Sequence, residues 1–320
     1  MKRIGVITSG GDCPGMNAAV RGVVRAALHR GCQVTGYLHG YTGIISGETK
    51  MLDSQAVGGI ISMGGTILRT ARSTEFRETE GRQKAMERLI EAGVEGLVVI
   101  GGDGSLAGAL KLHEEFDYPV AGVPGSIDND IPGTDYSIGF DTAINTALEA
   151  IDRVRDTAYS HERVFVIEVM GRRNGFIALE CGLAGGAEAA LIPEEDYSLA
   201  KVCEDLKTAA ERGKRSSIII VAEGAMRAPD VQAFIEKHTG FEARCLVLGH
   251  MQRGGRPTAF DRTLALRLGA YAVDSLLEGV SDHMAGVDGS KLVRHPLGFV
   301  LSMHRAVDPG KMRLLELMAQ

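Results

Sequence analysis

Two carboxylates one residue apart, Asp128 and Asp130, are the first candidates for chemistry in this sequence. They lie in a stretch bounded by Gly and Pro, 124–135, which follows the apolar run Val120–Val123. Asp is also common in turns, but a turn that needs only flexibility would not place two negative charges together. Such charges repel unless a cation or a proton-transfer partner offsets the cost. The pair therefore predicts proton transfer or cation binding at the end of a strand.

Glycine-rich turns follow two other apolar runs, at 8–17 and at 101–105. Glycines between a strand and a helix let backbone N–H groups approach an anion. The second turn also fits the loose dinucleotide pattern G-x-G-x-x-A, but its Asp103 would repel a bare pyrophosphate and attract Mg²⁺-bound phosphates. Because the sequence has no Walker A motif, this turn favours a metal-bound triphosphate.

Polar residues follow three later apolar runs as well. Met170-Gly-Arg172, Glu223 and the segment 250–255 each come soon after such a run. Arg guanidinium groups bind phosphate oxygens in a bidentate manner and offset charge during transfer. A single His or Arg after a strand is usually structural, but three successive strand ends of this kind favour a phosphate site.

Short apolar runs alternate with stretches of helical periodicity along the chain. The predicted strands are 4–8, 33–37, 97–100, 120–123, 164–169, 218–222 and 244–248. The predicted helices are 16–28, 82–92, 106–114, 141–157, 199–212 and 258–277. This alternation predicts an α/β fold with mainly parallel, doubly wound sheets. The 320 residues suffice for two lobes, and we expect the change of lobe near 133–140.

Composition argues against several classes of partner. The net charge of −6 provides no global basic field for nucleic acid. The five cysteines lie far apart, which predicts neither a disulfide framework nor a zinc site and fits a reducing cytoplasm. A strand is predicted from residue 4, so we expect no signal peptide, and no apolar run approaches the ~20 residues that span a bilayer. We therefore expect a cytoplasmic protein with neither a nucleic-acid nor a membrane partner.

Four motifs together resemble bacterial ATP-dependent 6-phosphofructokinases, the phosphofructokinase A family. They are Gly-Gly-Asp-Gly-Ser at 101–105, Pro-Gly-Ser-Ile-Asp-Asn-Asp at 124–130, Met-Gly-Arg at 170–172 and His-Met-Gln-Arg-Gly-Gly at 250–255. The resemblance runs from Lys2 to about residue 280, with the motifs in the family's order. It implies Mg²⁺-dependent phosphorylation of D-fructose 6-phosphate by ATP to fructose 1,6-bisphosphate, a step of glycolysis.

The resemblance also implies two lobes with the active site in the cleft between them. The nucleotide-binding lobe would comprise 1–138 plus about 251–301, and the sugar-phosphate-binding lobe 139–250 plus about 302–320. In the family, Arg163 and Arg244 reach in from a neighbouring subunit. That arrangement implies a homotetramer with shared active sites.

Individual roles follow from the resemblance. Asp128 matches the general base that takes the proton from the sugar 1-hydroxyl, Asp130 a second active-site acid, and Arg172 the arginine that stabilises the transferring phosphoryl group. Asp103 matches the Mg²⁺-associated acid. The residues that match the ATP site are Gly11, Tyr41, Arg72, Ser73, Gly102, Asp103, Gly104 and Ser105. Those that match the fructose 6-phosphate site are Ser126, Ile127, Asp128, Arg163, Met170, Gly171, Arg172, Glu223, Arg244, His250, Met251, Gln252 and Arg253.

Two small residues bear on the phosphoryl donor. In pyrophosphate-dependent relatives the position of Gly104 is usually Asp and that of Gly125 is usually Lys. Glycine at both positions leaves room for the α-phosphate of a nucleotide. Ser126 stands where the family usually has Thr and keeps the hydroxyl, so we expect a modest effect on substrate affinity.

An allosteric site at a subunit interface, with ADP as activator and phosphoenolpyruvate as inhibitor, is also implied. The matching residues are Arg21, Gly22, Val23, Val24, Arg25, Arg155, Gly186, Ala187, Glu188, Arg212, Lys214, Arg215 and Ser216. Position 54 is Ser where well-studied relatives carry an effector-binding Arg. Loss of one such Arg costs about 1.5–3 kcal/mol of effector affinity, so we expect a weakened effector site.

Three alternative functions stay open at this point. A pyrophosphate-dependent phosphofructokinase is opposed by Gly104 and Gly125. A kinase for NAD or lipids shares the Gly-Gly-Asp-Gly turn, but the polar residues after the three later strands oppose it. A dehydrogenase or a non-catalytic dinucleotide-binding regulator would leave Asp128 and Asp130 without a role.

Overall fold

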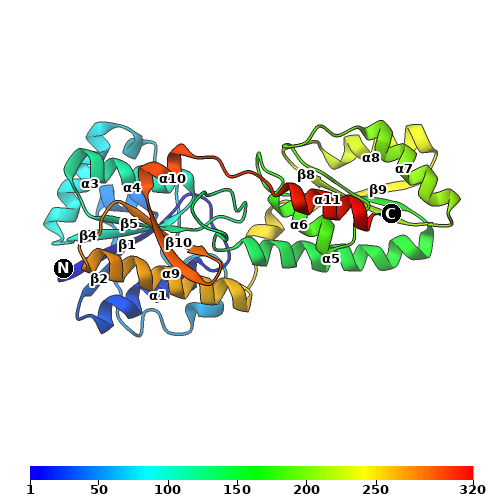
Figure 1. The fold of residues 1–320 in the computed structure, drawn as a ribbon. Coiled ribbons are helices and arrows are strands. Elements are labelled where there is room, and N and C mark those ends of the chain that lie inside the picture. Colours follow the sequence, from blue (N-terminus) through cyan, green and yellow to red (C-terminus); the bar gives the residue numbers. More distant parts are fainter. Residues whose placement is uncertain (320) are drawn as a thin grey trace. The chain divides into compact units, whose positions relative to one another are not determined.

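A computed structural model describes residues 1–319 of the chain. The chain forms two compact units (Figure 1). The first unit comprises Met1–Thr142 and Arg253–Arg305, and the second comprises Ala143–Gln252 and the chain from Ala306 onward. The chain therefore passes three times from one unit to the other.

A seven-stranded sheet forms the centre of the first unit. Across the sheet its strands are β11 (Lys291–Pro296), β10 (His283–Asp288), β5 (Val120–Pro124), β4 (Gly96–Gly101), β1 (Arg3–Ser9), β2 (Gln33–Tyr37) and β3 (Thr49–Met51). The five inner strands pair in parallel, whereas β11 and β3 are antiparallel edge strands. The predicted α/β fold with mainly parallel sheets is confirmed.

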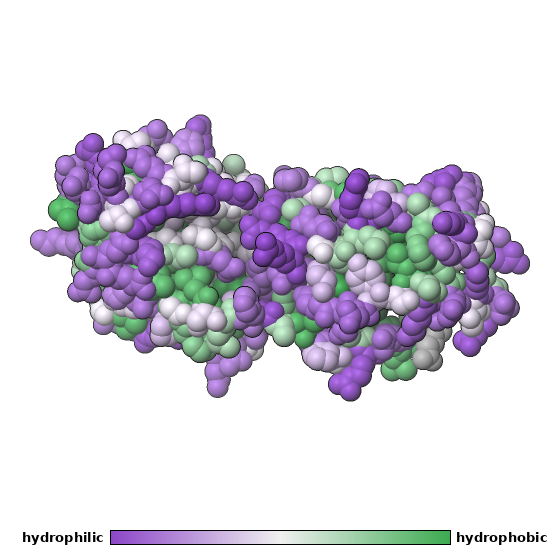
Figure 2. Space-filling view, turned by 90° about the horizontal axis from the view of Figure 1, so that it is seen from above, coloured by the Kyte–Doolittle hydropathy of each residue, from purple (hydrophilic) through white to green (hydrophobic). Residues whose placement is uncertain are grey.

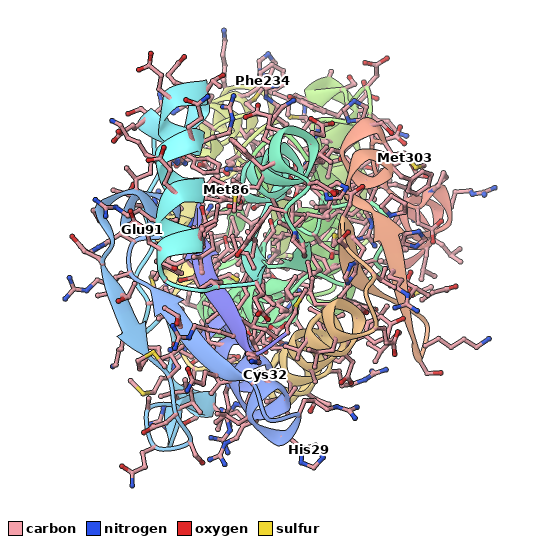
Figure 3. The ribbon with its side chains drawn as sticks, turned by 90° about the vertical axis from the view of Figure 1, so that its left-hand side faces the viewer. His29, Cys32, Met86, Glu91, Phe234 and Met303 are labelled. Carbon is pink, nitrogen blue, oxygen red and sulfur yellow. The ribbon has the colours of Figure 1, made fainter. Side chains whose placement is uncertain are left out.

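Helices cover both faces of this sheet (Figure 1). One face carries α1 (Met16–His29) and α9 (Ala259–Leu277), and the other carries α3 (Thr79–Glu91), α4 (Asp103–Phe116) and α10 (Leu297–Ser302). The remaining short elements are α2 (Tyr41–Ser46), η1 (Ile60–Ser62) and η2 (Glu75–Arg77). Figure 3 shows His29 at the end of α1 pointing outward, while Cys32, just before β2, is buried.

The second unit has a four-stranded parallel sheet. Across this sheet its strands are β7 (Ala189–Leu191), β8 (Ser217–Ala222), β6 (Val164–Val169) and β9 (Ala243–Val247). The helices on one face are α5 (Phe140–His161), α6 (Phe176–Ala184) and α11 (Pro309–Met318), and those on the other are α7 (Leu199–Glu211) and α8 (Ala228–Thr239) (Figure 1). The 3-10 turn η3 (Gly249–Arg253) follows β9 and leads back into the first unit.

Each unit has an apolar core of its own. Strand residues such as Val99 and Leu97 form the first core with helix residues such as Leu106, and Ile219 and Val166 contribute to the second. Figure 2 shows hydrophilic residues over much of the visible face, with smaller hydrophobic areas between them. Among residues 1–319, no helix combines the length and the apolar character that a membrane span requires.

A buried carboxylate ties the start of α5 to α9 within the first unit. Asp261 Oδ1 accepts a hydrogen bond from Gly139 N at 2.9 Å. Its Oδ2 accepts from Thr142 N at 2.8 Å and from Thr142 Oγ1 at 2.5 Å. Burial nevertheless raises the pKa of Asp261 to about 6, because desolvation of the ionised carboxylate outweighs these donors.

The raised pKa predicts how Asp261 affects stability. Since the folded protein binds this proton more tightly than the unfolded chain, the contribution of Asp261 is present at low pH and is lost as pH rises through about 6. Relative to Asp261→Asn, the wild type should lose up to about 3 kcal/mol of unfolding free energy between pH 4 and pH 7. Urea unfolding of both proteins across this range measures the difference. A wild type that gains unfolding free energy relative to Asp261→Asn as pH rises would show that the donors at Gly139 and Thr142 outweigh desolvation.

Candidate active site

The strands β1, β4 and β5, whose following turns are predicted to carry the chemistry, end at the same side of the sheet. Parallel pairing sets Ser9 of β1 opposite Gly101 of β4, and Gly101 opposite Pro124 of β5. Gly125 N donates to Gly101 O at 3.0 Å, which continues the pairing beyond β5. The turns that follow β1, β4 and β5 therefore lie side by side.

The turn after β4 combines close backbone packing with an open helix start. A Cβ on Gly101 would lie 2.5 Å from Ser9 O, so a larger residue would force the β1 and β4 ends apart. Gly102 is the N-cap of α4, and Asp103, the first residue of the helix, is exposed. A Cβ on Gly104 would have no atom of another part of the chain within 4 Å. This helix start favours an anion through its N–H groups and its dipole, and it carries a carboxylate that favours a cation.

The loop after β5 holds the two carboxylates in different environments. Asp128 is 2% exposed, whereas Asp130 is half-buried. The Ser126 hydroxyl contacts both residues, because its Oγ accepts from Asp128 N at 3.2 Å and donates to Asp130 Oδ1 at 3.2 Å. The side chain of Ile127, which is also predicted for the substrate site, is fully buried in the core.

Two further residues shape this loop and were missed by sequence reasoning. Asn129 has a φ of 52°, and its side chain accepts from Ser137 N at 2.8 Å and donates to Asp135 O at 3.2 Å. Arg305 donates to Asn129 O at 2.9 Å and to Asp135 O at 2.7 Å. Asn129 lies inside a motif and could have been found there. Arg305 lies beyond the stretch that resembles the family, so no local signal indicates it.

Arg253 lies against the glycine turn that follows β1. Its Nη1 donates to Asp12 O at 3.1 Å and would lie 2.6 Å from a Cβ on Gly11. Gly11, predicted for the ATP site, and Arg253, predicted for the sugar-phosphate site, are therefore neighbours within the first unit. The missing side chain at position 11 is what admits the guanidinium.

The other residues predicted for the ATP site lie in the same unit. Tyr41 is buried, its ring stacks on Phe76 with centroids 3.9 Å apart, and its hydroxyl donates to Ser105 O at 2.6 Å. Burial raises the pKa of Tyr41 well above its usual value. Ser73 Oγ accepts from Phe76 N at 3.2 Å, and Arg72 is exposed. Tyr41 is thus part of the wall behind the β4 turn.

The loop after β6 holds Arg172 in an unusual backbone conformation. Gly171 has a φ of 144° and Arg172 a φ of 55°, and the Arg172 side chain is exposed. Glu223, which follows the neighbouring strand β8, accepts from Arg172 N at 2.8 Å. A left-handed non-glycine residue persists only where its surroundings determine it, and Glu223 is one such determinant.

The residues of the turn η3 differ in their exposure to solvent. His250 and Met251 are exposed, whereas Gln252 is fully buried. The side-chain amide of Gln252, which is also predicted for the substrate site, bonds to Met170 N and Ala143 O.

Arg163 and Arg244 lie where the strands of the second sheet begin, whereas Arg172 lies where β6 ends. Both contact the Glu242 carboxylate, Arg163 with an N–O distance of 2.9 Å, and the bond from Arg163 lowers the pKa of Glu242. Arg163 precedes β6, whereas Arg172 follows it, and the six residues of β6 span about 20 Å. Within one chain these two arginines are therefore separated from Arg172.

The residues predicted for effector binding lie in both units. In the first unit, Arg21 donates to Val57 O at 2.6 Å and Arg25 to Ser54 O at 3.2 Å. Val23 and Val24, which are also predicted for the effector site, are fully buried, because helical periodicity turns their side chains into the core. Gly22 is also buried, since α9 packs closely over it.

In the second unit, Arg155 donates to Gly186 O at 3.0 Å and Glu188 pairs with Lys214 at 2.7 Å. Ala187, which is also predicted for the effector site, is buried. Arg215 pairs with Glu162, and the neighbouring Ser216 is half-buried. A hollow of about 720 Å³ between α7, β7 and the end of α11 includes Arg212, Glu188 and Lys214 in its lining.

Comparison with known proteins identifies the family. Residues 3–276 match the family model of phosphofructokinase. The chain is 56% identical over 314 residues to the ATP-dependent 6-phosphofructokinases of Bacillus pumilus (strain SAFR-032) and of Bacillus subtilis (strain 168). Both alignments cover 98% of each protein.

Solved structures show the same fold. Phosphofructokinase from Saccharomyces cerevisiae has a TM-score of 0.88 at 38% identity. The match covers 94% of this chain and 45% of the yeast chain, so the present chain spans less than half of the yeast chain. A pyrophosphate-dependent phosphofructokinase from Marinobacter aquaeolei has a TM-score of 0.86 over 98% of this chain and 91% of that chain, at 23% identity, which is a likeness of fold alone. With the family model and the full-length relatives in agreement, this chain belongs to the phosphofructokinase family.

Proposed function

We propose that the chain transfers the γ-phosphoryl group of ATP to the 1-hydroxyl of fructose 6-phosphate, as a 6-phosphofructokinase of glycolysis. The observation that carries this proposal is the meeting of three turns at one sheet edge. There, an anion-binding helix start lies beside the acidic loop. The names of the relatives, ATP-dependent 6-phosphofructokinases, support the same donor and acceptor. We assign ATP to the first unit, near 1–138 and 251–301, and the sugar phosphate to the second, near 139–250 and 302–320.

Asp128 is the proposed general base. Asp128 N donates to the Ser126 hydroxyl, and the next residue, Asn129, is held in a left-handed conformation by its side-chain hydrogen bonds. The carboxylate therefore has a defined position in the loop. A base at this position removes the proton of the sugar 1-hydroxyl as the oxygen attacks phosphorus. Phosphoryl transfer requires little covalent chemistry from the protein beyond this proton transfer, positioning and charge compensation.

Mg²⁺ is the proposed metal, and Asp103 is its proposed protein ligand. Among residues 1–319, no three His, Cys, Asp or Glu side chains are grouped to hold a metal. A single carboxylate together with phosphate oxygens is the usual way in which proteins hold Mg²⁺ on a nucleotide. When bound, the ion would neutralise charge on the phosphates. Gly104, with free space around it, leaves room for the nucleotide beside Asp103.

The sugar-phosphate residues of the second unit have complementary charges. Arg172 is proposed to stabilise the transferring group, and Glu223 holds its backbone. The proposed sugar-phosphate ligands also include two residues of η3, His250 of the second unit and Arg253 of the first. Guanidinium groups suit the phosphate of the sugar because their fork matches two oxygens.

A homotetramer with shared sites is proposed from the position of Arg163 and Arg244. Both follow the family's pattern for phosphate contacts, yet they lie at the edge of the sheet opposite to Arg172. A second copy of the chain that presents these arginines would complete the site.

Effector control by ADP and phosphoenolpyruvate is proposed for the basic residues of α1 and of the second unit. Arg25 contacts the backbone of Ser54, where well-studied relatives carry Arg, so one phosphate-pairing group is missing at this position. We therefore propose a weakened effector response. The proposed location is the cytoplasm.

Replacing the base tests the proposal. Asp128→Ala should lower kcat about 10²–10⁴-fold while the binding of an unreactive ATP analogue, measured by calorimetry, stays close to that of the wild type. Glu87→Ala, which removes an exposed carboxylate on α3, is the matched control and should keep full turnover. Unchanged turnover in Asp128→Ala would refute the assignment of the base.

Subunit mixing tests the shared site. Neither Arg172→Ala nor the double variant Arg163→Ala, Arg244→Ala should be active alone. After exchange of subunits, random pairing restores both sets of arginines at about a quarter of the sites. Steady-state assays of the mixture should therefore recover up to about a quarter of wild-type activity. If mixing restores nothing although exchange is verified by mass spectrometry, all three arginines act within one chain or not at the same site.

A further inference from the structure

Gln252 is a buried polar residue at a crossing between the two units. It is the last residue of the second unit before the chain enters the first. Its side chain is fully buried, although its neighbours His250 and Met251 are exposed. A buried amide requires partners for both its oxygen and its nitrogen.

Both partners of this amide belong to the backbone of the second unit. Gln252 Oε1 accepts from Met170 N at 2.8 Å, and Nε2 donates to Ala143 O at 3.4 Å. Because a backbone N–H can only donate and a carbonyl can only accept, the two partners determine the orientation of the amide. Met170 opens the loop after β6, and Ala143 lies in α5 as the first residue of the second unit.

The Met170–Arg172 loop is thereby held at both ends by side-chain acceptors. Gln252 accepts from Met170 N, and Glu223 accepts from Arg172 N at 2.8 Å. Two residues of this loop have positive φ, Gly171 at 144° and Arg172 at 55°. A left-handed conformation is unfavourable for a non-glycine residue and requires external support. The support on one side comes from Gln252.

We propose that Gln252 is a positioning residue that sets the loop of Arg172, and that it does not bind the sugar phosphate through its side chain. The same amide fixes the distance between this loop and the η3 turn, which presents His250 and Arg253. The expected effect on kcat rests on the proposed function. The hydrogen bond from Met170 N to Gln252 does not depend on it.

Gln252→Glu distinguishes positioning from simple packing. A glutamate has nearly the same shape, but its ionised form only accepts hydrogen bonds and would face Ala143 O with a negative charge. Its protonated form again has one acceptor and one donor, and burial raises the pKa of such a carboxyl. We expect kcat to be about tenfold lower or more at pH 8, and to approach the wild-type value as pH falls toward 6. The matched control is Gln83→Glu on the exposed face of α3, whose ratio to wild type should not change with pH.

Hydrogen exchange provides a readout that needs no substrate. In Gln252→Leu, Met170 N loses its acceptor, so its amide should exchange about tenfold faster or more than in the wild type, by the cost of an unmade buried hydrogen bond. Exchange of amides in β8, which Gln252 does not contact, should stay unchanged. If Gln252→Leu does not fold, the same comparison applies to Gln252→Glu between pH 6 and pH 8.

The proposal is overturned if Gln252→Glu keeps the wild-type kcat at pH 8, or if its loss appears only in thermal stability or in KM for fructose 6-phosphate. Unchanged exchange at Met170 also overturns it. If the wild-type protein itself fails to phosphorylate fructose 6-phosphate, the proposed function fails, while faster exchange at Met170 would still support the structural part.

Discussion

The parallel register of β1, β4 and β5 is the constraint on which the site depends. It places Ser9, Gly101 and Pro124 level with one another, so the three following turns open at the same edge. Glycine at 101 permits this approach, since a Cβ there would lie 2.5 Å from Ser9 O. An anion-binding helix start and a pair of carboxylates then share one region. Such a combination is favourable only when a cation joins them, and a nucleotide with its metal meets that requirement.

The residues proposed for the chemistry come from both units. Asp103, Asp128 and Asp130 come from strand ends of one sheet, and Arg172 from a strand end of the other. The second sheet also separates its own arginines, because Arg163 and Arg244 lie at the opposite edge from Arg172. A single chain thus carries every group that the proposed reaction needs but does not place all of them at one site. Oligomeric assembly would then be part of the proposed catalysis.

The sequence predicted the elements that position the site, because each is an apolar run bounded by glycine turns. Its misses have physical causes. β3 and β11 are exposed edge strands with polar residues, and α6 is apolar except for Glu180 and so has little periodicity. Contacts between residues far apart in the sequence could not be predicted from it either. Arg305 on Asn129 and Gln252 on Ala143 are hydrogen bonds between segments that only the folded chain brings together.

The most direct test of the central claim is the rate of fructose 1,6-bisphosphate formation by the wild-type protein with either donor. Purified protein is assayed with fructose 6-phosphate and Mg²⁺, once with ATP and once with pyrophosphate. Glycine at positions 104 and 125, where pyrophosphate-dependent relatives usually carry Asp and Lys, predicts rapid turnover with ATP and little with pyrophosphate. Faster turnover with pyrophosphate, or none with ATP, would contradict the account.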